Sequence, residues 1–222
     1  MYADPMGFET VSLSTDFKTL LPGYYGGNQS WWNNKGLKTN DKYRENRGCG
    51  PVAGANVMLY LAKVVGFTNL YPYAYTQLGF LNIMNDMWKS MAPTCCGVTN
   101  MAIYVKGVLK YAKGRKVSLT AHWSPYGTMV TSAKKLDNTI KFVKEGLRKD
   151  CPVSLAVHGN SKLKVGTQSF SWHFMVITEI TDNRNDKGEG PVTITVSSWA
   201  AKYTLDFRQV VKSSYWRMTY FT

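Results

Sequence analysis

The hydrophobic residues in the first two thirds of the chain follow a helical period in several places. Residues 50–65 form an almost continuously apolar run, and Pro51 stands where the first turn of a helix tolerates its missing N–H. This run predicts a largely buried helix. Apolar residues three or four positions apart predict amphipathic helices over 76–89 and 133–149, and a third helix after Thr99, which suits a helix cap.

The pattern changes to one typical of strands after residue 116. Short apolar or alternating segments predict strands at 153–157, 173–180, 192–199, 203–207 and 215–221, with a polar turn over 182–188. Consecutive strands joined by turns favour antiparallel pairing. Helices first and antiparallel strands last together predict an α+β fold.

The N-terminal part of the chain differs in character from the rest. Residues 1–48 are rich in Gly, Asn, Trp and Tyr and show no regular period. They predict an irregular extension packed on one domain formed by residues 49–222. The pair Trp31 and Trp32, and the tyrosines of segment 71–75, have two interpretations: packing between loops, which we favour, or a substrate or carbohydrate surface.

Composition narrows the class of protein. A hydrophobic fraction of 44 % and an aromatic fraction of 14 % exclude intrinsic disorder as the main state, and no apolar run is long enough for a membrane span. The 27 basic and 14 acidic residues give a net charge of +13, which invites anionic partners. Because the lysines are scattered along the chain, we interpret them mainly as solvated surface and expect no specific nucleic-acid partner.

The cysteines and histidines do not predict a metal site. Neither a C-x-x-C nor an H-E-x-x-H motif occurs, and there is no Gly-rich phosphate loop, so we expect no metal and no cofactor. The four cysteines permit disulfides without requiring them: Cys95 and Cys96 are either buried thiols, or one of them pairs with Cys151.

Cys49 is the most informative cysteine. It lies between Gly48 and Gly50, where an irregular loop enters the helix predicted over 50–65. A helix N-terminus stabilises a thiolate, and backbone N–H groups there can face a developing oxyanion. The other interpretation is a structural cysteine at a tight turn.

His173 is the candidate base for this thiol. It begins an apolar strand, 124 residues after Cys49, and the following predicted strand brings Ser197 within reach of its ring. Strand alternation places Ser197 and Trp199 on one face, so Trp199 would shield a bond between Ser197 and His173. Of the other histidines, His158 is interpreted as structural or as part of the rim, and His122 has no feature that favours a role.

Three segments in this order carry a family resemblance. Gly-Cys-Gly-Pro-Val-Ala before a helix resembles the C39-like branch of the papain-like cysteine peptidases. Ser-Trp-His-Phe-Met-Val-Ile and Ser-Ser-Trp-Ala are similar to the histidine strand and the Asn-Ser-Trp-Gly strand of that superfamily, and Cys-Pro-Val-Ser-Leu-Ala-Val at 151–157 is similar to the strand before its histidine. The similarity spans about residues 46–207.

The resemblance implies a helical lobe, an antiparallel sheet lobe and a cleft between them. It implies attack of the Cys49 thiolate on a peptide or isopeptide carbonyl, an acyl-enzyme and its hydrolysis, with His173 as general base and acid. Ser197 stands where the family has Asn or Asp. Tyr43 stands where the family has the Gln of the oxyanion hole, so Asn46 is the expected substitute, with Gln29 as the alternative.

Three classes of function follow from the sequence. The leading one is a cysteine peptidase that acts on a peptide or protein substrate as a monomer. The second is a binding module with a degenerate site, favoured by Ser197 and Tyr43. The third, a binder of anionic polymers, rests on charge alone. The resemblance favours a bacterial extracellular or cell-surface protein, and a cytoplasmic location stays open.

Overall fold

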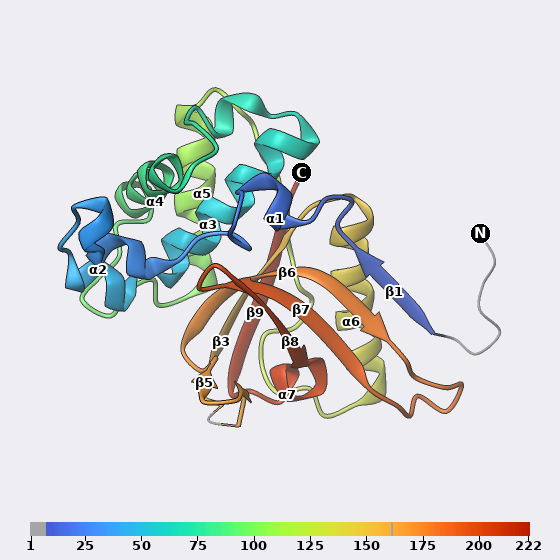
Figure 1. Ribbon diagram of the computed structural model, residues 1–222. Coiled ribbons are helices and arrows are strands. Elements are labelled where there is room, and N and C mark those ends of the chain that lie inside the picture. Colours follow the sequence, from blue (N-terminus) through green and yellow to red (C-terminus); the bar gives the residue numbers. More distant parts are fainter. Residues whose placement is uncertain (1–7, 161) are drawn as a thin grey trace.

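The computed structural model describes residues 8–160 and 162–222 and has an α+β fold. Helices gather on one side of the molecule, and an antiparallel sheet forms the other (Figure 1). The helical side contains α1 (Phe17–Leu20), α2 (Lys42–Arg47), α3 (Cys49–Tyr60), α4 (Gln77–Met91) and α5 (Met101–Gly114), with short helical turns η1 (Gln29–Asn33), η2 (Lys35–Leu37), η3 (Leu61–Val65) and η4 (Thr68–Leu70).

Seven strands of the described chain make up the main sheet, and every pairing in it is antiparallel. Its path is β2 (Ala121–Trp123), β9 (Tyr215–Phe221), β3 (Val153–His158), β6 (His173–Asp182), β7 (Val192–Ser198) and β8 (Ala201–Asp206), and β1 (Glu9–Ser12) pairs with the second half of β6. The short strands β4 (Lys164–Val165) and β5 (Gln168–Ser169) form a separate hairpin. Helices α6 (Ala133–Arg148) and α7 (Phe207–Val211) complete the sheet side.

The helix predicted over 50–65 is confirmed, with a change of winding near its end. Helix α3 is buried from Gly50 to Tyr60, and the wider turn η3 continues it to Gly66, which ends it at a φ of 100°. The helices predicted at 76–89 and 133–149 correspond to α4 and α6. The third helix is capped by Asn100 and not by Thr99, because the Asn100 side chain accepts the Ile103 N–H at 3.0 Å.

The N-terminal segment is more regular than its sequence indicates. It contains β1, α1 and α2, and β1 pairs with β6 from Glu9 opposite Asp182 to Ser12 opposite Glu179. Both tryptophans, Trp31 and Trp32, are buried, which agrees with packing as their role. The segment therefore contributes a strand and part of the core. No helix in the described residues combines the length and apolar character that a membrane crossing requires.

Candidate active site

Cys49 is the first residue of α3 and is partly exposed. The two glycines beside it allow close packing. A Cβ on Gly48 would lie 2.0 Å from a ring carbon of Trp32, and a Cβ on Gly50 would lie 2.7 Å from a methyl carbon of Val98. The glycines therefore allow neighbouring side chains to pack closely against the start of α3.

His173 begins β6 opposite Val157 of β3, as the sequence predicts for a histidine at the start of a strand. Its ring is buried. Its Nε2 lies 2.6 Å from the hydroxyl of Ser198, and the indole of Trp199 stacks on it with ring centroids 4.1 Å apart and an angle of 10° between the planes. One ring nitrogen is thus engaged by a hydroxyl, and one ring face is covered.

The orienting hydroxyl belongs to Ser198, so the expected bond between Ser197 and His173 is wrong. The Ser197 hydroxyl donates to the Tyr25 carbonyl at 2.7 Å and accepts from the Asn56 side chain at 3.3 Å. The Asn56 oxygen accepts the Gly27 N–H at 2.9 Å. Ser197 therefore anchors the loop over residues 25–27 to the sheet.

The hairpin turn between β7 and β8 carries backbone strain. Trp199 and Ala200, its two central residues, have φ values of 47° and 59°, a conformation that normally favours glycine. The loop over residues 25–28 supports it: Tyr25 N–H donates to Ala200 O at 3.0 Å, and Ala200 N–H donates to Gly27 O at 2.8 Å. The strained turn brings the Trp199 indole onto the His173 ring.

Cys49 and His173 line one small cavity of about 10 Å³. The other residues that line it are Gln29, Val52, Ala53, Asn56, Phe174, Ser197, Ser198 and Trp199. Gln29, the alternative considered for the oxyanion hole, is therefore at the site. Its Nε2 donates to the Glu45 carbonyl at 2.7 Å, and the same nitrogen carries a second N–H.

Burial acts on both reactive groups in this small cavity. It raises the pKa of the Cys49 thiol, against the backbone N–H groups of Phe174 and Gly50, which lower that pKa. Burial also lowers the pKa of His173 to about 3. Each effect disfavours the charged form. The unliganded site therefore favours a thiol and a neutral imidazole over the thiolate that the helix N-terminus alone would predict.

A second, larger groove of about 140 Å³ also reaches Cys49. Asn46, the first choice for the oxyanion hole, lies here, exposed on α2, and does not line the cavity with His173. Trp172 also lines this groove; it is 72 % exposed, and its indole stacks on the ring of His158 with centroids 4.7 Å apart. His158 is thus part of the groove rim, one of the two roles expected for it.

The remaining candidates lie away from this site. His122 contacts Thr222 through Nε2 at 2.8 Å and stacks on Tyr220. Tyr43 is exposed on α2. Cys151 is a free thiol in the core, so no disulfide joins it to Cys95 or Cys96. The expectation that those two thiols are buried is wrong, because both are exposed. Within the ranges that the structure covers, no three His, Cys, Asp or Glu side chains converge as a metal site would require.

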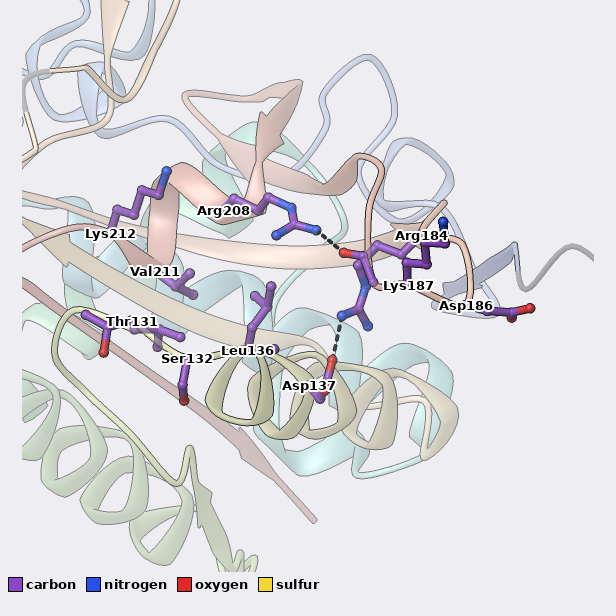
Figure 2. Close-up of a pocket in the computed structure, with 13 residues that line it drawn as sticks. Thr131, Ser132, Leu136, Asp137, Arg184, Asp186, Lys187, Arg208, Val211 and Lys212 are labelled. Atoms are coloured by element: carbon purple, nitrogen blue, oxygen red, sulfur yellow. Dashed lines mark hydrogen bonds and ion pairs between the residues drawn. The ribbon is translucent and has the colours of Figure 1, made fainter.

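Figure 2 shows a larger cavity, of about 450 Å³, between the start of α6, the loop after β6 and helix α7. Its two guanidinium groups serve internal contacts: Arg184 pairs with Asp137 and Asp182, and Arg208 donates to the Gly188 carbonyl. It contains no cysteine or histidine. Neither the thiol nor the imidazole that the sequence predicts therefore lies in this cavity.

Comparison of the chain with family models, with curated proteins and with solved structures found no match.

Proposed function

We propose that this protein is a cysteine peptidase of the C39-like, papain-like type that hydrolyses peptide or isopeptide bonds. The observation that carries the proposal is the shared cavity: Cys49 at the start of a buried helix and His173 at the start of a central strand line it together, and Ser198 engages the outer ring nitrogen. The α+β arrangement and the order of the three motifs support the same class.

The proposed reaction starts from a neutral thiol. When Nε2 of His173 carries the ring hydrogen and Ser198 accepts it, Nδ1 is free to take the proton from Cys49 as the sulfur attacks the substrate carbonyl. The resulting imidazolium gives that proton to the leaving amine, and an acyl-enzyme remains. Water, deprotonated by His173, then releases the acid and restores the thiol.

The developing oxyanion needs donors close to Cys49. The side-chain N–H of Gln29 and the backbone N–H groups at the start of α3 are the proposed donors, because they border the same cavity as the sulfur. Asn46 is not proposed for this role, since it lies on the groove side. The 140 Å³ groove takes the substrate residue beside the scissile bond, with the Trp172 indole as an apolar contact.

The test is cleavage of a mixed peptide library, followed by mass spectrometry of the products. We expect cleavage by the wild-type protein and its loss in Cys49→Ala and His173→Ala. Cys95→Ala, which removes an exposed thiol outside the cavity, is the matched control and should keep full activity. Cleavage that survives in Cys49→Ala, or no cleavage by a folded wild-type protein, overturns the proposal.

A second candidate is a peptide-binding module with an occluded site. The observation that favours it is the small size of the cavity: about 10 Å³ holds no substrate group, and His173 is 6 % exposed. Binding of library peptides without turnover, unchanged in Cys49→Ala and weakened in Trp172→Ala, would support this module over the peptidase.

A further inference from the structure

The segment between α4 and α5 contains a tight turn with two adjacent cysteines. Thr94 and Gly97 pair as an isolated bridge: Thr94 N–H donates to Gly97 O at 3.2 Å, and Gly97 N–H donates to Thr94 O at 2.9 Å. Cys95 and Cys96 are the two central residues. Gly97 has a φ of 82°, so this turn depends on a glycine.

The turn brings the two sulfurs together. In an extended strand, neighbouring side chains point to opposite faces. Here Sγ of Cys95 and Sγ of Cys96 are 3.7 Å apart, and both residues are exposed. Arg47 holds the turn from α2 by donating through Nε to the Cys95 carbonyl. The pair is thus pre-positioned and open to a reagent in solution.

We propose that Cys95 and Cys96 form a redox modification site, in which a small disulfide oxidises them to a ring disulfide between adjacent residues. One cysteine sulfur attacks the small disulfide and releases its first thiol. The neighbouring cysteine sulfur then attacks the mixed disulfide and releases the second thiol. The protein loses two hydrogens, and the small disulfide is reduced to two thiols.

The ring is expected to be readily reversible. Adjacent Cα atoms lie about 3.8 Å apart across a trans peptide, below the roughly 4.4 Å minimum usual for disulfides. Strained and exposed disulfides are the easily reduced ones. Cys96 also lines the groove beside Cys49, so oxidation changes one wall of that groove. The proposal itself does not depend on peptidase activity.

The experiment treats the reduced protein with glutathione disulfide, unfolds it in urea, blocks the remaining thiols with iodoacetamide and maps the tryptic peptides. Cleavage after Lys89 and Lys106 places Cys95 and Cys96 alone in peptide 90–106, whereas Cys49 falls in peptide 48–63. We expect peptide 90–106 without label and lighter by two hydrogens than its reduced, unlabelled form, full label on peptide 48–63, and recovery of both labels after reduction.

Single variants separate ring closure from simple adduct formation. Cys95→Ser and Cys96→Ser should each stop at the mixed disulfide with glutathione, because the second thiol is missing. The proposal is overturned if the wild-type peptide 90–106 stays doubly labelled, accumulates glutathione or becomes cross-linked to peptide 48–63. None of these outcomes depends on whether the peptide library is cleaved.

Discussion

Replacing Ser198 by Ala tests the arrangement around His173 most directly. The Ser198 hydroxyl lies 2.6 Å from Nε2 of His173, and both residues are buried. The variant removes one oxygen, and no other side chain in the described residues hydrogen-bonds to that nitrogen. The imidazole then keeps its stacking contact with Trp199 but loses its hydrogen bond to the Ser198 hydroxyl.

The magnitude follows from the charge that His173 acquires during the reaction. A hydrogen bond to a charged group contributes about 1.5–3 kcal/mol. At about 1.4 kcal/mol per factor of ten, its loss in the transition state lowers kcat/KM by roughly 10-fold to 150-fold. Stability falls as well, because a buried ring N–H is left unpaired at a cost of about 1–3 kcal/mol.

The neighbouring hydroxyl provides the matched control. Ser197→Ala removes a bond to the Tyr25 carbonyl, so it lowers stability by a similar amount of about 1–3 kcal/mol but leaves the His173 bond in place. Peptide hydrolysis measures the change in kcat/KM, and urea unfolding measures the change in stability. The nuclear magnetic resonance signal of the hydrogen-bonded imidazole N–H gives a readout that needs no activity.

The expected pattern is loss of kcat/KM and of the imidazole signal in Ser198→Ala alone. Equal losses in both variants would mean that the activity change reports general destabilisation. A Ser198→Ala protein with wild-type turnover and an unchanged imidazole signal would refute the orienting role of this hydroxyl.

Three further predictions concern the packing and protonation of the same region. Gly48→Ala should lower the free energy of unfolding by about 1–3 kcal/mol in urea titrations, because its Cβ would overlap the Trp32 ring. Ala200→Gly should raise the free energy of unfolding by up to about 1 kcal/mol, since glycine adopts the left-handed φ without strain. Equal or lower stability of this variant would contradict backbone strain at Ala200. The pKa of His173 is about 3 in the folded protein and 6.5 ordinarily, so the unfolded chain binds the proton first as pH falls. The free energy of unfolding should therefore fall by about 1.4 kcal/mol per pH unit between about pH 6.5 and 3. His173→Asn should remove this contribution to the pH dependence of stability.

Much of the fold could be predicted because the pattern of each long element is clear over several turns or residue pairs. Helices α4 and α6 and strands β3, β6 and β9 lie where the sequence places them. Elements with few residues could not be predicted in this way. Strand β1 has four residues of mixed polarity and becomes a strand through its pairing with β6, a contact between residues about 170 positions apart.

Strand alternation and helical periodicity could not predict two residues of the site, Ser198 and Gln29. Alternation along a strand assigns Ser197 and Trp199 to one face, but β7 ends at Ser198, and the left-handed φ of Trp199 turns its ring onto His173. The hydroxyl that contacts His173 is therefore that of Ser198, one residue after the predicted Ser197. Gln29 reaches the cavity from a short helical turn held by Asn28, and such a turn leaves no period in the sequence.

The protonation state of Cys49 decides how the proposed reaction begins. A helix N-terminus favours an anion by about 0.3–1 kcal/mol, and at most about 2 kcal/mol, which is less than 1.5 pKa units. Burial shifts a pKa by up to about 3–5 units. Burial is therefore the larger effect, and it raises the pKa of the Cys49 thiol above its ordinary value of 9.0.

The rate of Cys49 alkylation by iodoacetamide should consequently keep rising with pH beyond 9 in the unliganded protein. The reagent reacts with thiolate, so its rate follows ionisation of this thiol. A rate that already reaches its plateau below pH 7, and loses that plateau in His173→Ala, would show a preformed thiolate and imidazolium and refute the neutral starting state. If the rate rises only at high pH, the thiolate that attacks substrate must form within the complex, with His173 taking the proton as the carbon–sulfur bond forms.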